Sequence, residues 1–175
     1  MSKKVIFLDR DGVINKEVGY LHKIEDFEFI DGVFKACLYF QSLNYQIIVI
    51  TNQSGIGRGY YDEGDFHIVN NWMLEQFKNQ GIKILNVFFC PHDPESNCDC
   101  RKPKPGMFNQ ANDKYGIDME NSWLIGDKEA DIASANAAGI QNTVLVKSGH
   151  EINEKNSKAK FILDSIKQVK AAIKS

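Results

Sequence analysis

The chain has 175 residues, a formal net charge of −2 at pH 7 and no long basic run. This length suits a single domain, residues 1–175, with a sizeable core, and the charge excludes the basic surface typical of nucleic-acid-binding proteins. No apolar stretch is long enough to cross a bilayer, and the N-terminus lacks the features of a secretory signal. We therefore expect a cytoplasmic monomer without a membrane or nucleic-acid partner.

The first predicted element is a short, fully buried strand over residues 5–8, which runs directly into Asp9, Asp11 and Gly12. Ligands bind at the carboxyl ends of strands in open α/β sheets, so both carboxylates are candidates for binding one metal ion or one substrate. An Asp-rich turn without function is the alternative that these residues leave open.

Residues 15–30 have no regular period and are predicted to form a loop over this site, where Glu17, Tyr20 and His22 are candidates for substrate contact. For Tyr20 and His22 taken singly, an ordinary surface position is the competing interpretation. Asp31 is the predicted N-cap of a helix that continues to about residue 43.

A second buried strand is predicted over residues 46–52, ending in Thr51 and Asn52. Residues 53–59 contain three glycines and small polar side chains, a composition that favours a loop whose backbone N–H groups surround an anion. The loop does not fit the P-loop pattern, because no Gly-Lys-Ser/Thr follows. Asp62 is the predicted N-cap of a second helix, which Gly81 ends.

A third strand, residues 84–89, precedes a proline-rich loop, residues 90–100, that holds Cys90, His92, Cys98 and Cys100. Three thiols and one imidazole form a complete tetrahedral zinc set with no position left for substrate, so the expected role of zinc is structural. Reduced cysteines without metal are the alternative. The remaining cysteine, Cys37, is predicted to pack in the core as a small hydrophobe.

Arg101 and Lys102 follow this loop at once and are candidates for holding a phosphate, with a solvated basic run as the alternative. Pro105 is predicted to start a third helix that continues to about residue 115 and stops at Gly116. The remaining elements are a strand over residues 123–127 ending at Asp127, a helix ended by Gly139, a strand over residues 143–146, a short strand at 161–162 and a final helix.

Strands alternate with helices throughout, which predicts an α/β fold: a Rossmann-like parallel sheet with helices on both faces. The carboxyl ends of all strands then share one edge, where the chain gathers carboxylates, a hydroxyl and two cations. Carboxylates alone would repel phosphate, but Mg²⁺ among them offsets that repulsion. This mixture favours phosphoryl transfer, in which a carboxylate nucleophile forms an aspartyl-phosphate and a neighbouring acid protonates the leaving alcohol.

Four motifs resemble those of the haloacid dehalogenase superfamily of phosphatases: Asp9-Arg10-Asp11-Gly12, Thr51 at a strand end, Lys102, and Gly126-Asp127 with Asp131. Within that superfamily, Cys-x-His followed by Cys-x-Cys-Arg-Lys-Pro is similar to the branch that contains heptose 1,7-bisphosphate 7-phosphatases and histidinol-phosphate phosphatases. That branch has no large cap domain, in agreement with the absence of an inserted domain in this sequence.

The resemblance implies Asp9 as nucleophile and Asp11 as general acid and base, with Mg²⁺ bound by Asp9, the Asp11 carbonyl and Asp127. Thr51 and Lys102 would hold the phosphoryl group. We predict that the substrate is contacted by Glu17, Tyr20, Asn52, Gln53, Ser54, Arg101 and Lys128. The implied cofactors are catalytic Mg²⁺ and structural Zn²⁺.

The segments at residues 51–59 and 102–107 resemble the heptose enzymes, which remove the C7 phosphate of D-glycero-D-manno-heptose 1,7-bisphosphate in the supply of nucleotide-activated heptose for cell-surface polysaccharide. The short interval between His92 and Cys98 is closer to the histidinol-phosphate type, which is the first alternative. A non-catalytic, zinc-stabilised binding protein is the second. A catalytic zinc hydrolase is excluded, because the cysteine and histidine ligands already fill the metal's coordination sphere.

Overall fold

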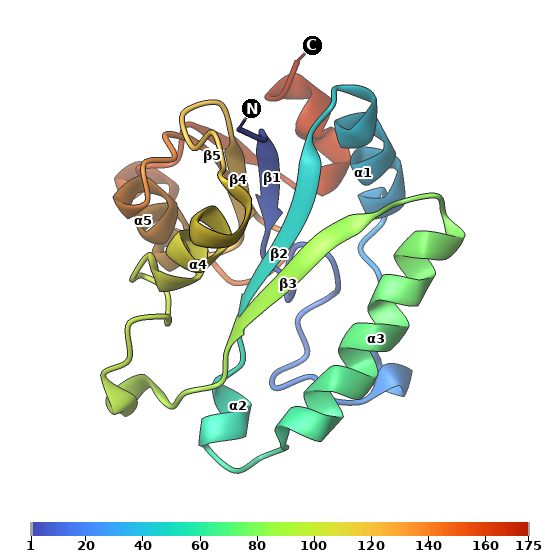
Figure 1. Ribbon diagram of the computed structural model, residues 1–175, viewed down its shortest axis with the longest axis vertical. Coiled ribbons are helices and arrows are strands. Elements are labelled where there is room, and N and C mark those ends of the chain that lie inside the picture. The colour runs from blue at the N-terminus through green and yellow to red at the C-terminus, as the bar shows by residue number, and fades with distance from the viewer. Residues whose placement is uncertain (1, 175) are drawn as a thin grey trace.

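The computed structural model describes residues 2–174 and is built around a six-stranded, all-parallel sheet (Figure 1). The strand order is β3-β2-β1-β4-β5-β6. The strands span Val5–Leu8 (β1), Gln46–Asn52 (β2), Ile84–Cys90 (β3), Trp123–Gly126 (β4), Asn142–Val146 (β5) and Phe161–Leu163 (β6). The chain winds outward from β1 to β3 and then restarts at β4 on the other side of β1. The crevice of such a sheet lies at this reversal, beyond the carboxyl ends of β1 and β4.

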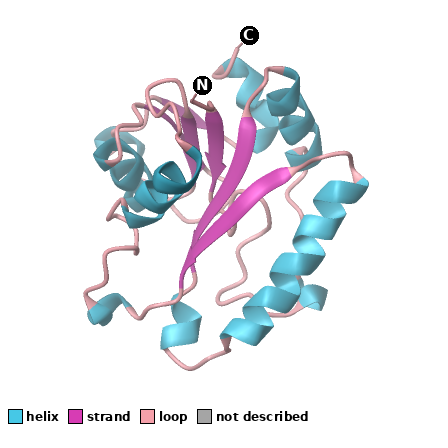
Figure 2. Cartoon of the chain, viewed as in Figure 1, coloured by secondary structure: helices cyan, strands magenta, loops and turns pink. Residues whose placement is uncertain are grey.

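Helices cover both faces of the sheet, as the sequence predicted (Figures 1 and 2). The α-helices span Val33–Ser42 (α1), Ser54–Gly57 (α2), Glu63–Asn79 (α3), Gly106–Tyr115 (α4) and Glu129–Ala137 (α5). Four short 3₁₀ helices span Ile24–Asp26 (η1), Pro94–Ser96 (η2), Glu154–Asn156 (η3) and Ile166–Ala171 (η4). Helices α1, α3 and η4 pack on one face, and α4 and α5 pack on the other. Among the described residues, no helix is both long and apolar enough to cross a bilayer.

The apolar residues of β1 alternate between two separate cores, because successive strand side chains point to opposite faces. Ile6 and Leu8 contribute to the core beneath α1 and α3, whereas Val5 and Phe7 contribute to the core beneath α4 and α5. Burying each such side chain stabilises the fold by about 1.5–3 kcal/mol. Cys37 lies in the first core, as predicted, and its burial raises the pKa of the thiol to about 12.

Most predicted helix ends are confirmed. The Asp62 side chain accepts a hydrogen bond from the backbone N–H of Asp65, and the Asp65 side chain accepts one from the backbone N–H of Asp62, which completes a capping box at the start of α3. Gly116 ends α4 in the left-handed conformation. The prediction for Asp31 is wrong: Gly32 is the N-cap of α1, with a φ of 86°, and makes no side-chain capping bond. Asp31 instead pairs with Lys167 at 2.7 Å, a partner 136 positions away in the sequence.

Two further segments differ from the expected conformation. The predicted glycine loop at residues 53–59 contains the short helix α2, and the predicted final helix is the 3₁₀ helix η4. The third strand extends one residue further than predicted and ends at Cys90. Each strand along the carboxyl edge therefore leads directly into a polar or metal-binding side chain.

Candidate functional site

Asp9, Asp127, Asp131 and Lys102 form a buried group at the reversal of strand order, which we call the carboxylate–lysine centre. The Lys102 ammonium donates to Asp9 Oδ1 at 3.0 Å, to Asp131 Oδ1 at 2.6 Å and to the Ile50 carbonyl at 3.3 Å. One oxygen from each of the three carboxylates lies within 4.8 Å of the others. Two of the three carboxylates, Asp9 and Asp131, therefore pair with one fixed cation.

This imbalance of charge changes the acidity of the nucleophile candidate. Burial, followed by the charge of Asp131, raises the pKa of Asp9 well above its ordinary value, although Lys102 opposes the change. Burial alone would lower the pKa of Lys102, but Asp131 and Asp9 outweigh it and raise that pKa. Lys102 is therefore a permanent cation, and a second positive charge nearby would lower the pKa of Asp9 toward its ordinary value.

The Asp127 carboxylate is the group to which a second positive charge would bind. One of its oxygens, Oδ2, accepts from the backbone N–H of His150 at 3.1 Å and lies 2.6 Å from the Nδ1 atom of the same residue. Its other oxygen, Oδ1, is buried without a hydrogen-bond partner among the described residues. A Cβ atom at Gly12 or Gly149 would lie 2.2 or 2.1 Å from Oδ2, so only glycine fits on either side. An unpaired buried carboxylate oxygen beside Asp9 fits a hard divalent cation.

Asp131 has a different role from Asp127. Its Oδ2 atom accepts from the backbone N–H groups of Asp127 and Lys128, at 3.0 and 3.1 Å, while its Oδ1 atom binds Lys102. Both oxygens are thus already engaged in fixing the start of α5 and the lysine. A Cβ atom on Gly126 would lie 2.4 Å from the Asp131 Cβ, so the glycine in this motif permits the contact.

Asp11 lies at the mouth of the centre, with 21% of its side chain exposed. Its Oδ1 atom accepts from Arg10 Nη2 and from Asn15 Nδ2, both at 3.0 Å. Its Oδ2 atom accepts from Gln53 Nε2 at 3.2 Å. Arg10 and Asn15 are almost fully buried, so one carboxylate oxygen is held from inside the protein while the other faces the site.

Asn52 was predicted to touch substrate, and its amide binds the backbone of Lys102. Asn52 Oδ1 accepts from the Lys102 N–H at 3.2 Å, and Asn52 Nδ2 donates to the Lys102 carbonyl at 3.4 Å. The end of β2 thereby fixes the segment that delivers the lysine. Asn52 also lines the pocket described next, so the two roles are compatible.

A pocket of about 350 Å³ opens outward from Asp11, and a smaller space of about 80 Å³ lies between Asp9, Lys102 and Asp127. The structure brings together around the larger pocket all but one of the candidates for substrate contact: Glu17, Tyr20, Asn52, Gln53, Ser54, Arg101 and Lys128. His22, the weaker candidate, stacks on Tyr61 instead. A larger hollow of about 540 Å³, between α1 and η4, contains no comparable cluster of reactive groups.

Besides Gly19 and Leu21, three polar side chains that line the pocket were absent from the predicted site: Arg58, Tyr61 and His150. Arg58 lies in the glycine-rich segment that had been singled out, and its charge was the signal available. His150 lies in the loop after β5, at the predicted edge of the sheet. Tyr61 carries no signal in the sequence, because its relation to the site depends on a buried contact with Gln53.

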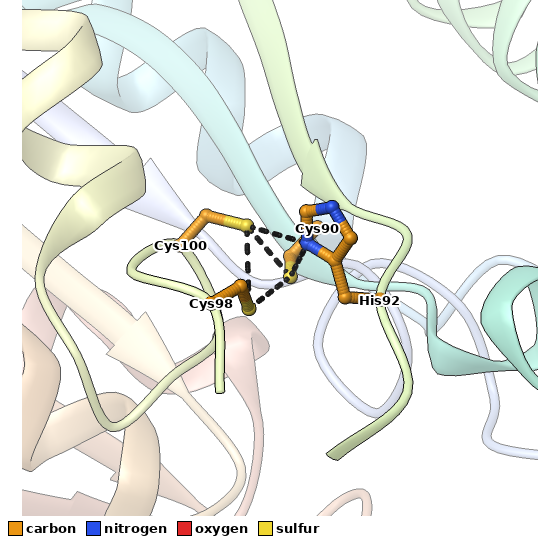
Figure 3. A group of neighbouring side chains, drawn as sticks. All are labelled: Cys90, His92, Cys98 and Cys100. Carbon is orange, nitrogen blue, oxygen red and sulfur yellow. Dashed lines mark hydrogen bonds between the residues drawn. The ribbon is translucent and has the colours of Figure 1, made fainter. Parts of the chain in front are cut away.

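The cysteine–histidine cluster, which consists of Cys90, His92, Cys98 and Cys100, lies in the loop after β3 (Figure 3). The Sγ atoms of Cys90 and Cys98 are 3.6 Å apart, and those of Cys98 and Cys100 are 3.7 Å apart. His92 presents Nδ1 to the group, 3.4 Å from Cys90 Sγ and 3.2 Å from Cys100 Sγ. Ligands about 2.3 Å from a tetrahedral zinc ion stand about 3.8 Å apart, close to most of these distances.

The cluster is continuous with the segment that carries Arg101 and Lys102. Desolvation would raise the pKa of Cys98, but hydrogen bonds from the Arg101 backbone and the Ser96 side chain outweigh it and lower the pKa to about 6. Lys104 Nζ donates to the Cys98 carbonyl at 2.8 Å, and Ser134 of α5 donates to the Lys104 carbonyl at 2.7 Å. The loop that carries Arg101 and Lys102 is thus fixed from both ends.

Comparisons with known proteins place these features in context. A family model described as HAD-hydrolase-like matches residues 99–169. The chain is 48% identical over 163 residues to the D-glycero-alpha-D-manno-heptose-1,7-bisphosphate 7-phosphatase of Photorhabdus laumondii, covering 89% of each chain. It is 45% identical over 177 residues to the corresponding beta enzyme of Vibrio cholerae, covering 97% of this chain and 95% of the relative.

Solved structures agree with the sequence relatives. The crystal structure of the D,D-heptose 1,7-bisphosphate phosphatase of B. bronchiseptica, complexed with magnesium and phosphate, matches with a TM-score of 0.83 and 27% identity, covering 95% of both chains. A HAD-like phosphatase from Mesorhizobium loti matches with a TM-score of 0.80 and 27% identity, covering 98% of this chain and 86% of that one.

Proposed function

The chain belongs to the family of D-glycero-D-manno-heptose-1,7-bisphosphate 7-phosphatases, and from this membership we propose how its site acts on that substrate. It is a phosphatase of the haloacid dehalogenase type that acts on a sugar bisphosphate. Neither histidinol phosphate nor a non-catalytic role is favoured, because the relatives are named for the heptose substrate along nearly the whole chain.

One observation carries the proposed mode of binding: the reactive carboxylates stand at one end of a pocket whose outer wall is cationic. Asp9 and Asp11 mark the reactive end, while Arg58, Arg101 and Lys128 line the outer pocket. Arg101 Nη1 is buried without a hydrogen-bond partner among the described residues. A sugar with phosphates at both ends matches this arrangement, with the C7 phosphate at the carboxylates and the C1 phosphate among the cations.

The reaction then proceeds in two displacements. A carboxylate oxygen of Asp9 attacks the phosphorus of the C7 phosphate, the bond between phosphorus and the C7 oxygen breaks, and Asp11 donates a proton to that oxygen. In the second step Asp11 removes a proton from water, and the resulting hydroxide attacks the aspartyl-phosphate at phosphorus. Inorganic phosphate leaves and Asp9 is regenerated.

The other residues hold the transferred group during both steps. Lys102 and Thr51, which are 4% and 1% exposed, supply an ammonium and a hydroxyl at the reactive end. Asp9, the Asp11 carbonyl and Asp127 would hold Mg²⁺. When bound, Mg²⁺ offsets the charge between Asp9 and the phosphate oxygens and allows the carboxylate to ionise.

We further propose that the cysteine–histidine cluster binds structural zinc. Support comes from four ligand atoms that converge and from the absence of an open position for substrate. Cys90 ends β3, and Cys100 immediately precedes Arg101. Zinc would therefore fix the segment that carries Arg101 and Lys102 relative to the sheet.

The experiment that tests the function measures phosphate release with Mg²⁺ on both anomers of heptose 1,7-bisphosphate and on histidinol phosphate. We expect kcat/KM to be at least tenfold higher for one of the heptose anomers than for histidinol phosphate. A preference for histidinol phosphate would overturn the substrate assignment.

The cationic outer wall gives a sharper test of how the substrate lies. Arg58→Ala should lower kcat/KM for heptose 1,7-bisphosphate by about tenfold, the effect of losing one charge-assisted hydrogen bond to phosphate. It should leave heptose 7-phosphate, which lacks the distal phosphate, within twofold of wild type. Equal losses on both substrates would contradict the proposed position of the C1 phosphate.

A further inference from the structure

A buried amide connects the two sides of the catalytic end of the pocket. Gln53 Nε2 donates to Thr51 Oγ1 at 2.8 Å and to Asp11 Oδ2 at 3.2 Å. The Tyr61 hydroxyl donates to Gln53 Oε1 at 2.5 Å. Gln53 is 3% exposed and Tyr61 is 7% exposed. We call this arrangement of Tyr61, Gln53, Thr51 and Asp11 the Gln53 bridge.

The partners of Gln53 allow its amide only one orientation. In its ionised form the Asp11 carboxylate only accepts hydrogen bonds, so the nitrogen of the amide must face it in that form. Both hydrogens on that nitrogen are then used, and the amide oxygen is left facing Tyr61. Burial raises the pKa of Tyr61 to about 12, so its hydroxyl keeps its proton and acts as a donor throughout the neutral range.

Only one oxygen of Asp11 is available for proton exchange with a substrate. Oδ1 is held by Arg10 and Asn15, which are 1% and 0% exposed. Oδ2 faces the pocket, and the only hydrogen bond it accepts among the described residues comes from Gln53. The position of the reactive oxygen therefore depends on the orientation of one amide.

Tyr61 is itself fixed by the two loops over the site. The His22 ring stacks on Tyr61 with centroids 5.1 Å apart and an angle of 5° between the planes. A Cβ atom on Gly55 would lie 2.2 Å from the Tyr61 ring, so the glycine allows the ring to lie against α2. These contacts direct the hydroxyl inward at the amide and hold it there.

We propose that Tyr61 is a positioning residue that, through Gln53, aims Oδ2 of Asp11 at the leaving oxygen of the C7 phosphate. This inference rests on the proposed acid–base role of Asp11. As the bond between phosphorus and the C7 oxygen breaks, the proton on Oδ2 passes to that oxygen and Asp11 becomes a carboxylate. In this role the Gln53 amide nitrogen binds Asp11 and Thr51 and not the substrate, because both of its N–H donors are engaged.

The test uses a series of aryl phosphates of similar shape, from phenyl phosphate to p-nitrophenyl phosphate, together with heptose 1,7-bisphosphate. Proton donation matters most for the least acidic leaving group, and kcat/KM reports only the steps up to formation of the aspartyl-phosphate. Tyr61→Phe keeps the ring and removes the hydroxyl. We expect kcat/KM to fall about tenfold for phenyl phosphate and heptose 1,7-bisphosphate and less than twofold for p-nitrophenyl phosphate.

Two controls separate positioning from other roles. Tyr60→Phe removes the same atom from an adjacent tyrosine that is 57% exposed, and it should leave the whole series unchanged. Gln53→Leu should reproduce the steeper dependence on leaving group, and adding Tyr61→Phe to it should cause no further loss, because both changes break the same connection. Additive losses in the double variant would overturn the proposal.

The remaining outcomes are also distinct. An equal loss on every phosphate, or a loss confined to the heptose substrate, would overturn the positioning role, since the first indicates general structural damage and the second a contact with the sugar. If wild type hydrolyses aryl phosphates but not the heptose bisphosphate, the substrate assignment fails while the aryl series still tests the role of Tyr61.

Discussion

The carboxylate–lysine centre and the cysteine–histidine cluster both lie at the carboxyl edge of one sheet, and each gathers residues that bind metals. They differ in what their groups leave unsatisfied. In the centre, three carboxylates lie together, Asp9 and Asp131 pair with the Lys102 ammonium, and Asp127 Oδ1 has no partner among the described residues. In the cluster, the four ligand atoms face one another at 2.8–3.7 Å and together supply the four ligands of a tetrahedral ion.

The difference separates a metal used in chemistry from a metal used in folding. A catalytic ion needs an incomplete coordination sphere, so that the substrate supplies the missing ligands. A structural ion needs a complete one, and it stabilises a loop without a core of its own. The loop of residues 90–100 contains only short structure, η2, and several of its residues are exposed. Damage to the two regions should therefore be measured by different quantities, turnover for one and stability for the other.

The largest expected effect is a loss of turnover without unfolding, caused by a change in the carboxylate–lysine centre. Asp9→Asn removes the nucleophile but preserves an oxygen that can accept from Lys102, so kcat should fall on the order of 10⁴-fold or more while the protein stays folded. Phosphate release and thermal unfolding measured on the same preparation check both parts. Activity within tenfold of wild type would contradict the assignment of the nucleophile.

The cluster should respond in the opposite way. Cys98→Ser removes one of four ligands, and we expect loss of bound zinc and a loss of stability on the order of 3 kcal/mol, or about 6–12 °C in Tm. Because Arg101 and Lys102 follow the loop, kcat/KM should fall by about tenfold, far less than for Asp9→Asn. Zinc analysis and calorimetry provide the measurement.

A matched control for that experiment is Cys37→Ala, which removes a buried thiol far from the cluster in sequence. It should keep its zinc. Should Cys98→Ser retain both zinc and the wild-type Tm, the cluster would have no structural metal, and the contrast between the two regions would disappear.

The sequence was sufficient for features that depend on local pattern. Short apolar runs predicted all six strands, and the residue directly after a strand proved to lie at the site in the cases of Asp9 and Asp127. The glycine after the two carboxylates, Gly12, has a φ of 90°, a conformation that glycine adopts readily. These outcomes follow because strand ends in a parallel sheet share one edge whatever the details of packing.

Features that depend on distant partners could not be predicted. Asp31 pairs with Lys167 instead of capping α1, and Tyr61 reaches the site through a hydrogen bond to Gln53. Gln53 lines the pocket, and the hydrogen bonds of its N–H groups to Thr51 and Asp11 also depend on the folded structure. In each case the deciding contact comes from tertiary structure, which residue type and spacing do not contain.

The smallest effect distinguishes the two regions without any turnover. Burial and the charge of Asp131 raise the pKa of Asp9 above its unfolded value, so between those two values the folded state holds a proton that the unfolded state has lost. Stability of the metal-free protein therefore falls as pH rises through this window.

Asn at position 9 has no such proton, so with chelator present Asp9→Asn should be more stable than wild type at pH 7, on the order of 1 kcal/mol or about 2–4 °C in Tm. The gap should close at the acid end of the window, and Mg²⁺ should raise the Tm of wild type more than that of the variant, because only wild type offers a charged ligand at position 9. A metal-free variant that is less stable than wild type at pH 7 would show that the three carboxylates are not in excess of the charge that Lys102 supplies.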